Sequence, residues 1–366
     1  MISSASFILR CFVAVLAVHA GWIDRCMAAD SSPTTSVSDH FQQSLKTSLE
    51  KAGSSSSMTI PGVDGWLFLD KELRHLSAPK FWSDLPESEA DSNNPLPAIL
   101  DFKAQLDKAG VDLLLVPVPT KAAIYPDKLM AGNPIPPQVT ADLVKKDRDF
   151  YKLLESRGVK VLDLTETFLD ARNAESPDLY CKTDTHWAPP GIQLAAKKIA
   201  ERFKDLPWVT AQPKVETKAV DVPLAIHGDL AASLIPPQTT TEPLTSRFIG
   251  LAASASLEPL PNSKSSPIIL LGDSHNLVFH SGGDMHSVGS GLSDQLSHEL
   301  GFPLDVIAVM GSGATSARRN LARRKDNLAG RRLVIWCFTS REFTQGQGWA
   351  KVPLIKEPTP ATSLVK

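Results

Sequence analysis

Short runs of continuous apolar residues constrain this chain more than any other feature of its sequence. Strands with a solvent face alternate apolar and polar residues, whereas continuous apolar strands need cover on both faces, as in parallel sheets. Amphipathic stretches with helical spacing separate the runs, which predicts an α/β domain of three layers, αβα, around a mostly parallel sheet. The expected strands are Leu113–Pro119, Val159–Leu164, Pro267–Leu271, Leu304–Met310 and Arg332–Phe338. The expected helices are Ala98–Ala109, Ala141–Ser156 and Pro190–Lys204.

The N-terminus has the pattern of an export signal. One positive charge precedes an apolar stretch that starts near Cys11, and small residues end the segment at Ala29. This run suits a secretory signal and is short for a membrane span, although an uncleaved anchor is the alternative. We therefore expect a signal peptide or anchor over 1–29, a flexible lead-in over 30–57, the folded domain over 58–352 and a flexible tail over 353–366.

Charge and cysteine content narrow the classes of function. The 38 basic and 40 acidic side chains leave a net charge of -2, which gives no electrostatic case for nucleic-acid binding. A basic run between Arg318 and Arg332 either attracts an acidic polysaccharide or forms the solvated face of a helix. Cys181 and Cys337 lie beyond the signal region, and they either form one disulfide in an exported protein or are two buried free thiols.

An Asp-x-His pair is the first candidate for chemistry. Asp184 and His186 are two residues apart in a segment that Pro189 and Pro190 stiffen. In an extended loop these side chains point the same way, so the carboxylate can reach Nδ1 of the imidazole and hold its tautomer. The alternative is an ordinary loop Asp and His that contact solvent.

Two glycine-containing turns follow expected strands. Gly272-Asp273-Ser274 comes after Pro267–Leu271, where a serine that opens a helix lies at the ligand-binding edge of an open α/β sheet. A plain helix N-cap is the alternative. Gly311-Ser312-Gly313 comes after the next strand, and a glycine N–H there either points at an oxyanion or belongs to an ordinary turn.

Taken in order, these clusters resemble the AlgJ/AlgX family of alginate O-acetyltransferases, whose SGNH-like domain is circularly permuted. The Asp/His pair precedes the serine, which reverses the usual SGNH order. Further matching segments are Gly62–Leu69 (GVDGWLFL), Val116–Lys121 (VPVPTK) with Tyr125-Pro126, His227–Leu230 (HGDL), and Trp336 with Arg341. The resemblance spans roughly Gly62–Arg341 and implies an SGNH/flavodoxin-like sheet.

The resemblance implies roles for particular residues. Ser274 would be the nucleophile, His186 the general base and then acid, and Asp184 the carboxylate that orients His186. Gly311, Gly313 and Arg341 are candidates for the oxyanion site or pocket. Substrate-contact candidates are Trp187, His275 and Tyr125. We expect Trp66 in the core because its neighbours are apolar, and we expect no metal and no cofactor.

The implied function is acetyl transfer through an acetyl-serine to a hydroxyl of an exopolysaccharide or cell-wall glycan. The alternatives are a carbohydrate acetylesterase that uses the same triad and a non-catalytic glycan-binding member of an export complex. The resemblance also implies an acetyl donor supplied by a membrane-bound O-acyltransferase, in a membrane-associated complex. The chain would act in the periplasm or be otherwise exported, tethered to the inner membrane if its N-terminus is kept.

Overall fold

A computed structural model describes the chain at residues 57–83, 92–129, 137–174, 177–253 and 257–355, and at parts of 43–50. These residues belong to one compact unit, 37–366. The expected signal or anchor over 1–29 and nearly all of the expected tail lie outside the described residues. Among the described helices, none combines the length and the apolar character that a membrane span requires.

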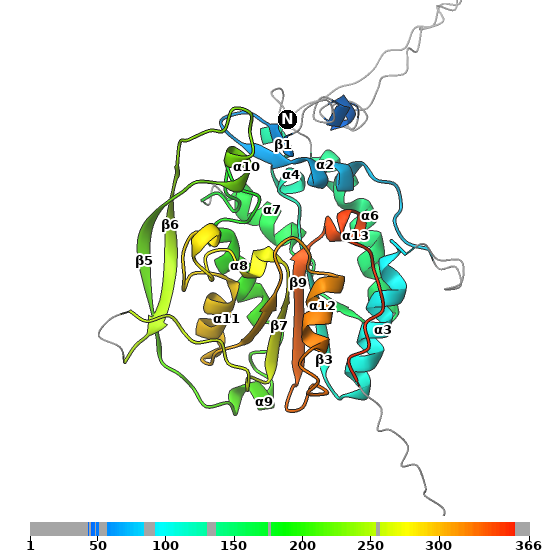
Figure 1. The fold of residues 1–366 in the computed structure, drawn as a ribbon, viewed down its shortest axis with the longest axis vertical. Coiled ribbons are helices and arrows are strands. Elements are labelled where there is room, and N and C mark those ends of the chain that lie inside the picture. The colour runs from blue at the N-terminus through cyan, green and yellow to red at the C-terminus, as the bar shows by residue number, and fades with distance from the viewer. Residues whose placement is uncertain are drawn as a thin grey trace, which may run out of the picture. The chain divides into compact units, whose positions relative to one another are not determined.

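A five-stranded parallel sheet forms the centre of this unit (Figure 1). Its spatial order is β4-β3-β9-β7-β8, and all four pairings are parallel. The strands are β3 (Asp112–Val118), β4 (Lys160–Val161), β7 (Ile268–Gly272), β8 (Asp305–Ala308) and β9 (Leu333–Thr339). The central strands are buried on both faces, as their continuous apolar runs predict.

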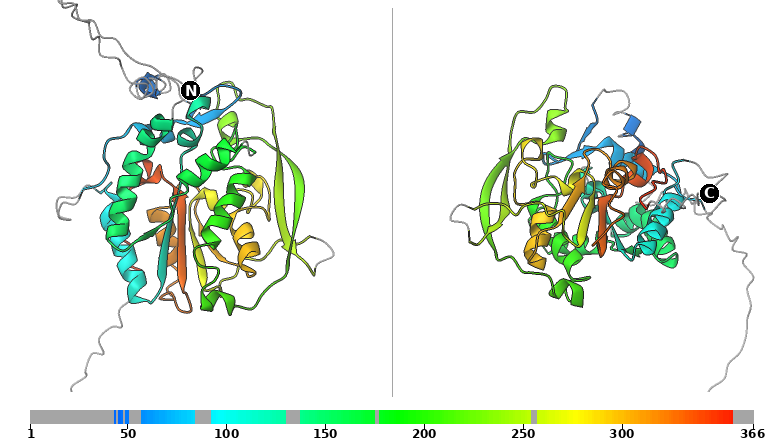
Figure 2. Two further views of the ribbon diagram at one scale, coloured as in Figure 1. Left: turned by 180° about the vertical axis from the view of Figure 1, so that it is seen from behind. Right: turned by 60° about the horizontal axis from the view of Figure 1, so that its bottom comes forward.

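Helices cover both faces of the sheet, and successive strand residues point to opposite layers (Figure 2). On one face, Leu270 and Ile335 pack with α8 and α11; on the other, Leu271 and Trp336 pack with α3 and α12. The helices at the sheet are α3 (Pro95–Lys108), α6 (Pro137–Ser156), α7 (Thr165–Asn173), α8 (Pro189–Ala200), α11 (Leu292–Leu300) and α12 (Thr315–Ala322). The expected three-layer αβα architecture is confirmed.

Short elements surround the end of the sheet where the parallel strands finish. They are α2 (Asp70–Ser77), α4 (Lys121–Ile124), α5 (Pro126–Leu129), α10 (Asp229–Ala232) and α13 (Glu342–Gln345). The short helix α9 (Pro207–Thr210) lies at the opposite end of the sheet in Figure 1. Two short 3-10 helices, η2 (Ser274–Asn276) and η3 (Gly283–Met285), lie between β7 and α11. A separate antiparallel pair, β1 (Thr59–Pro61) with β2 (Leu67–Leu69), precedes α2.

The weakly patterned region after α9 contains one long hairpin. Strands β5 (Thr217–Ile226) and β6 (Glu242–Leu251) pair in antiparallel register outside the main sheet, beside α8 and α11 in Figure 1. The sequence predicts only loops and small strands here, because β5 is mostly exposed and so lacks an apolar pattern. Each end of the hairpin is anchored by a buried isoleucine, Ile226 at the end of β5 and Ile249 near the end of β6.

The edges of the folded body differ from the sequence expectation. Leu45, in the expected flexible lead-in, has helical backbone and is fully buried against the core. Leu354, in the expected tail, is also buried, and its N–H donates to Gln105 Oε1 at 2.6 Å. The packed body therefore extends beyond 58–352 on both sides, because these leucines reach apolar surface that the sheet and helices leave open.

The basic run is less solvated than a helix face would be. Arg318 is buried on α12, with its guanidinium 5.2 Å from the Trp336 ring, and burial lowers its pKa to about 10. Arg324 and Arg331 both pair with Asp305, which is fully buried at the start of β8. These three arginines hold β8 and α12 in place. The solvated face that the sequence offered as one alternative is formed only by the other basic residues of the run, which are exposed.

Candidate active site

Four loops that follow parallel strands meet at one edge of the sheet. Ser274 follows β7, the Gly311–Gly313 turn follows β8, Arg341 follows β9, and Lys121 follows β3. A fifth segment, the Asp–His loop (residues 181–186), reaches this edge just before α8. The carboxyl edge of such a sheet is the usual ligand-binding edge, because the strand ends diverge there.

Ser274, His186 and Asp184 form one hydrogen-bonded chain. The Ser274 Oγ lies 2.8 Å from His186 Nε2, and His186 Nδ1 lies 2.7 Å from Asp184 Oδ1. The three side chains are almost buried, and Ser274 is 7% exposed. This geometry brings together the two motifs that the sequence separates by 88 positions, and it has the arrangement that activates a serine hydroxyl.

The charges in this chain are set by burial and by direct partners. Burial alone would raise the pKa of Asp184, but the His186 and His286 imidazoles hold it well below its usual range. Burial alone would lower the pKa of His186, but the Asp184 carboxylate outweighs it and the pKa is raised. Asp184 is therefore an anion that accepts hydrogen bonds only, and it stabilises positive charge on His186.

Asp184 accepts four hydrogen bonds. Oδ1 accepts from the His186 N–H as well as from its ring, and Oδ2 accepts from the Asp229 backbone N–H and from His286 Nε2, both at 3.0 Å. Asp229 lies in the quoted HGDL segment, and its own carboxylate accepts from the N–H and hydroxyl of Thr185 at 2.7 Å. The HGDL segment thus fixes the loop at both Asp184 and Thr185.

The Asp–His loop is also held from beneath by a buried lysine. Lys121 Nζ donates to the carbonyl oxygens of Cys181 at 2.9 Å and Asp184 at 2.7 Å. The rings of Trp66 and Phe68 lie 5.9 and 5.5 Å from the ammonium. The quoted VPVPTK and GVDGWLFL segments therefore build one support for this loop, and Trp66 is in the core as predicted.

The β5–β6 hairpin supports the same loop from the side. The Glu242 carboxylate, at the start of β6, accepts from the backbone N–H groups of Lys182 and Thr183 and from the Thr183 hydroxyl. Gly228 lies directly against Thr183, since a Cβ there would be 2.1 Å from the Thr183 carbonyl oxygen. Close approach therefore requires glycine at this position.

The Ser274 turn differs from the expected helix start. Ser274 opens η2, a 3-10 turn of three residues, rather than an α-helix, so a helix dipole adds little here. Gly272 is required for space, because a Cβ there would lie 1.7 Å from the Cys337 carbonyl oxygen. Asp273 fixes the turn by accepting from the N–H groups of His275 and Thr339, both at 2.9 Å. Among the described residues, no acceptor engages the Ser274 N–H.

Residues 59–340 match the sequence profile of a family described as SGNH hydrolase-like domain, acetyltransferase AlgX. The chain belongs to this family. The match covers most of the chain and includes every residue of the Ser–His–Asp arrangement. The central parallel sheet with helices on both faces is the AlgJ/AlgX-like SGNH fold that the sequence predicts.

Curated relatives of this AlgX-type family member carry the name probable alginate O-acetylase AlgJ. The protein from Pseudomonas fluorescens is 27% identical over 228 residues, 59% of this chain and 53% of the relative. The protein from Pseudomonas aeruginosa is 27% identical over 164 residues, 45% of this chain and 35% of the relative. The chain thus spans about half the length of the curated relatives it matches.

Two solved structures share the fold. The O-acetyltransferase domain of Pseudomonas putida AlgJ superposes with a TM-score of 0.58 at 20% identity, over 79% of this chain and 93% of that one. Pseudomonas aeruginosa AlgX superposes with a TM-score of 0.56 at 19% identity, over 78% of this chain and 63% of that one. This AlgX-type chain therefore shares the fold of the AlgJ domain and of the matched part of AlgX.

The structure separates the two glycine candidates beside the serine. Gly313 is buried against Asp273, and a Cβ there would lie 2.8 Å from the Asp273 nitrogen. Gly311 is exposed at a φ of 79°, with open space where its side chain would be. Gly313 lies beside the serine turn and Gly311 does not. Arg341 is held by Glu72 and Thr339. The Asp184 carboxylate raises the pKa of His186 and the charge of Arg341 opposes that rise, whereas at Asp273 the charge of Arg341 adds to the lowering of the pKa that His275 causes.

The three expected substrate contacts are buried, which corrects that expectation. Trp187 has no exposed surface, and its ring N–H donates to the His275 carbonyl at 3.1 Å. The Tyr125 hydroxyl accepts from the Leu179 N–H inside the core. His275 is 1% exposed and bonds to Asp273. These polar aromatic residues serve packing and hydrogen bonding, which a sequence cannot distinguish from ligand contact.

Cys181 and Cys337 are two buried free thiols, which is one of the two states that the sequence left open. Burial raises the pKa of each thiol well above its usual range. The Cys181 Sγ lies 3.7 Å from the Trp187 carbonyl oxygen, at the start of the Asp–His loop. Neither thiol is therefore in a state to act as a nucleophile.

Asp184, His186 and Asp229 offer ligand atoms within 4.8 Å of one another, a spacing that a cation can use. Each of the four carboxylate oxygens, however, already accepts an N–H or O–H donor. A cation would have to displace these donors, so the residues present favour hydrogen bonding over metal binding.

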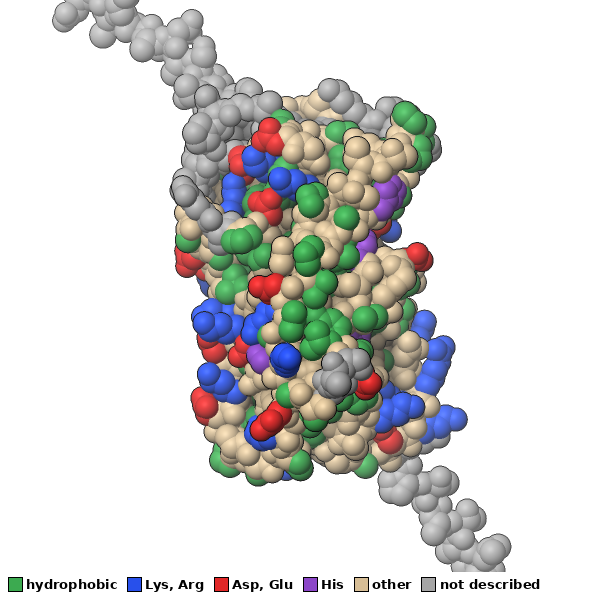
Figure 3. All heavy atoms as spheres, turned by 90° about the vertical axis from the view of Figure 1, so that its left-hand side faces the viewer, with side chains coloured by type: hydrophobic (Ala, Val, Ile, Leu, Met, Phe, Trp, Pro, Cys, Tyr) green, Lys and Arg blue, Asp and Glu red, His purple; other side chains and the backbone are tan. Residues whose placement is uncertain are grey.

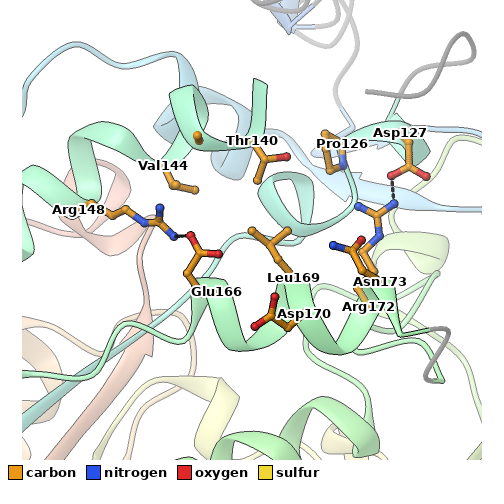
Figure 4. A pocket seen from close by; sticks show the side chains of 11 residues that line it. Pro126, Asp127, Thr140, Val144, Arg148, Glu166, Leu169, Asp170, Arg172 and Asn173 are labelled. Carbon is orange, nitrogen blue, oxygen red and sulfur yellow. Dashed lines mark hydrogen bonds and ion pairs between the residues drawn. The ribbon is translucent and has the colours of Figure 1, made fainter. Parts of the chain in front are cut away.

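Two cavities among the described residues differ in their relation to the site. One of about 540 Å³ borders it and is lined by Leu224, Ala225, Ile226, His227, Asp229, Ala232, Gly283, Asp284 and His286. Another, of about 430 Å³, lies between α6 and α7 (Figure 4), where Arg148 pairs with Glu166 and Arg172 with Asp127. Neither cavity is lined by Ser274, His186 or Asp184, but the first is lined by Asp229 and His286, which both bond to Asp184.

Sequence reasoning missed His286 and gave no role to Lys121 or Glu242. Lys121 ends the VPVPTK segment that resembles the family, but the segment does not predict that its ammonium binds the carbonyl groups of Cys181 and Asp184. His286 meets Asp184 across 102 positions, and no motif links them. Only the tertiary fold brings these side chains to the Asp–His loop.

Proposed function

We propose that this chain is an exported O-acetyltransferase that moves an acetyl group, through an acetyl-Ser274 intermediate, to a hydroxyl of an alginate-like exopolysaccharide or cell-wall glycan. The observation that carries the proposal is the continuous bonding from Ser274 Oγ through His186 to Asp184, at 2.8 and 2.7 Å. The names of the AlgJ relatives support acetyl transfer and an alginate-like acceptor.

In the first half-reaction, Ser274 Oγ attacks the acetyl carbonyl while its proton passes to His186 Nε2. The carbonyl oxygen becomes an oxyanion, and Asp184 stabilises the imidazolium. As the intermediate collapses, the bond to the donor group breaks, and that group leaves with the proton from His186. The acetyl group is then an ester of Ser274.

In the second half-reaction, a glycan hydroxyl attacks the acetyl-Ser274 carbonyl and gives its proton to His186. Collapse breaks the Ser274 ester bond and returns the proton to Ser274 Oγ, so the site is restored. A raised pKa of His186 suits both proton transfers, because the imidazole must accept and release a proton in each half.

The Ser274 N–H is the proposed first donor to the oxyanion, because it has no acceptor among the described residues and opens the 3-10 turn. The Gly313 N–H is the proposed second donor, since this glycine packs against Asp273. Two preorganised N–H groups at this position would stabilise the transition state more than the ground state.

Setting and partners belong to the same proposal. The N-terminal pattern favours export to the periplasm, and the resemblance favours an acetyl group delivered by a membrane-bound O-acyltransferase. The acceptor is a polysaccharide rather than a nucleic acid. The hairpin face of the molecule supports this, because basic and acidic side chains are interspersed there without a broad basic surface (Figure 3).

The test compares the full chain with Ser274→Ala, using a chromogenic acetyl ester as donor with and without alginate. We expect the wild type to release the chromogenic alcohol, to carry one acetyl group on the Ser274 peptide and to yield O-acetylated polymer. Ser274→Ala should lose about a thousandfold or more of the turnover, because the residual rate of a triad enzyme without its nucleophile is small.

The products separate the alternatives. Free acetate without acetylated polymer would identify a carbohydrate acetylesterase that uses the same residues. Turnover that Ser274→Ala leaves unchanged would remove the triad from the mechanism. A chain that binds alginate but never cleaves the ester would be a glycan-binding member of an export complex.

A further inference from the structure

The Asp184 carboxylate accepts from two imidazoles, not one. His186 Nδ1 lies 2.7 Å from Oδ1, and His286 Nε2 lies 3.0 Å from Oδ2. An ionised carboxylate has no proton to donate, so His286 must carry its proton on Nε2 to make this bond. The second imidazole thus binds the oxygen that His186 leaves free.

The backbone at His286 is in a rarely adopted conformation. Its φ is 71° and its ψ is -75°, and the Ser287 N–H donates to the Met285 carbonyl at 3.1 Å. These values describe a γ-turn whose central residue has positive φ, a rare and strained conformation for a residue with a Cβ. Strain of this kind persists only where the surroundings impose it, and it is concentrated at functional sites.

Neighbouring contacts hold this turn. The Phe279 N–H donates to the Met285 carbonyl at 2.8 Å, and the Gly282 N–H donates to the Ser287 carbonyl at 3.0 Å. The His286 ring packs on the Phe279 ring with 5.3 Å between centroids. The imidazole is therefore fixed by its own segment, and its position does not depend on the bond to Asp184.

We infer that His286 is a positioning residue for the acyl-transfer site: its fixed Nε2–H sets the rotation of the Asp184 carboxylate so that Oδ1 faces His186 Nδ1. This inference rests on the proposed function, because it assigns a role within the same triad. His286 touches neither substrate nor the reacting atoms, so it acts through Asp184.

Loss of the His286 N–H donor should shift the pKa of His186 in a direction that can be measured. Without the His286 N–H, the negative charge on Asp184 is less shared and attracts a proton on His186 more strongly. The charged and titratable groups at the cavity are Asp229, Asp284 and His227, with Lys121 at the Asp184 carbonyl and His275 and Arg341 acting on His186. Only Asp184 bonds to both imidazoles, so the shift should appear in the titration of His186.

The experiment compares His286→Gln with His286→Met in the full chain. Both side chains have similar length and carry the same backbone strain, but only glutamine offers an N–H near the position of Nε2. For hydrolysis of the acetyl ester we expect methionine to lower kcat about 10-fold to 100-fold with little change in KM, as for other lost outer partners of a functional group. Glutamine should recover most of that loss.

The pH profile separates positioning from a general structural defect. In His286→Met the acidic limb of kcat should move to higher pH, because His186 must be neutral to accept a proton. A change in folding alone would lower kcat equally at every pH. The control is His298→Ala, which alters a histidine on α11 whose ring bonds to the Thr217 hydroxyl instead of Asp184. This variant should keep the wild-type profile.

His286→Gly guards against a failure to fold. Glycine adopts positive φ without strain, so this variant should keep its thermal midpoint while kcat falls. Added imidazole should restore part of the rate, because His286 borders a cavity of about 540 Å³.

Equal kcat values and equal pH profiles for glutamine, methionine and wild type would overturn the role of His286. That result would leave the proposed function intact as long as Ser274→Ala is inactive. If Ser274→Ala retains turnover, the proposed function itself fails, whatever the His286 variants do.

Discussion

At the scale of single residues, His275 shows how an imidazole next to Ser274, the proposed nucleophile, is kept neutral. Burial lowers its pKa to about 4, although the Asp273 carboxylate acts in the opposite direction. Its ring centroid lies 4.9 Å from that of His186. A proton on His275 would oppose the imidazolium that His186 forms in the proposed reaction. Among the described residues, the neutral ring leaves His186 as the proposed base at Ser274.

This state of His275 makes stability depend on pH. The folded pKa of about 4 lies below the ordinary value of 6.5, so only the unfolded chain takes up this proton between those values. We expect the free energy of unfolding to fall as pH falls from about 6.5 toward about 4, by up to about 3 kcal/mol from this group. Urea unfolding at a series of pH values measures the change.

His275→Phe is the matched comparison, because it keeps an aromatic ring without a titrating group. Its stability should vary less than that of the wild type across this window. An identical slope in both proteins would show that His275 takes up its proton in the folded state as well. The lowered pKa of Asp273, about 2, affects stability only at lower pH.

At the scale of elements, the Asp–His loop is stable because other elements satisfy its backbone. Lys121 from α4 binds two of its carbonyl groups, Glu242 from β6 binds two of its N–H groups, and Asp229 from α10 binds a third. A loop with its polar groups bound in this way keeps the imidazole in place without a disulfide.

Lys121→Met should therefore unfold the loop before it disturbs the sheet. The two carbonyl groups would lose their donor in a buried site, which costs about 3 kcal/mol or more. Because His186 would also shift, we expect ester turnover to fall at least about 10-fold. Denaturant unfolding and steady-state kinetics on the same preparation measure both effects.

Lys145→Met is the control for Lys121→Met. Lys145 forms an exposed pair with Asp149 on α6, and its loss should change stability by about 0.5 kcal/mol or less. If the Lys121 variant were as stable and as active as this control, the support of the loop would lie in Glu242 and Asp229 instead.

The strands and long helices could be predicted because local pattern decides them. β3, β7 and β9 are buried on both faces, and each leaves a continuous apolar run in the sequence. The Ser274 turn and the β5 strand could not be predicted. The first depends on the room beside Cys337, and the second is held by its hairpin partner, so neither leaves a local pattern.

The same distinction applies to the site. Asp184 and His186 are local, and Ser274 follows a predictable strand, so the sequence identifies all three. His286, Lys121 and Glu242 reach the site from η3, α4 and β6, and their contacts depend on how distant segments pack. For Trp187 and Tyr125 the sequence suggests a substrate contact because each polar ring lies near a motif, but both rings are buried in the core.

At the scale of the whole molecule, the two free thiols report on opening of the core. Cys337 lies in the central strand β9 and Cys181 is the first residue of the Asp–His loop, and both are fully buried. With iodoacetamide we expect neither peptide to be alkylated in the folded protein and both to be alkylated in guanidinium chloride without reductant. Mass spectrometry of the two peptides measures the outcome. A linked pair of peptides would instead show a disulfide.

Strand β9 joins two halves of the sheet, since it lies between β3 and β7. During synthesis, the ribosome therefore releases β4-β3 and β7-β8 as two half-sheets with nothing between them. They cannot unite until Leu333–Thr339 emerges, although Asp184, His186 and Ser274 have long been translated. Because contacts so distant in sequence form slowly, the nascent chain keeps Ser274 apart from the β3 half of the sheet until residue 339 has emerged.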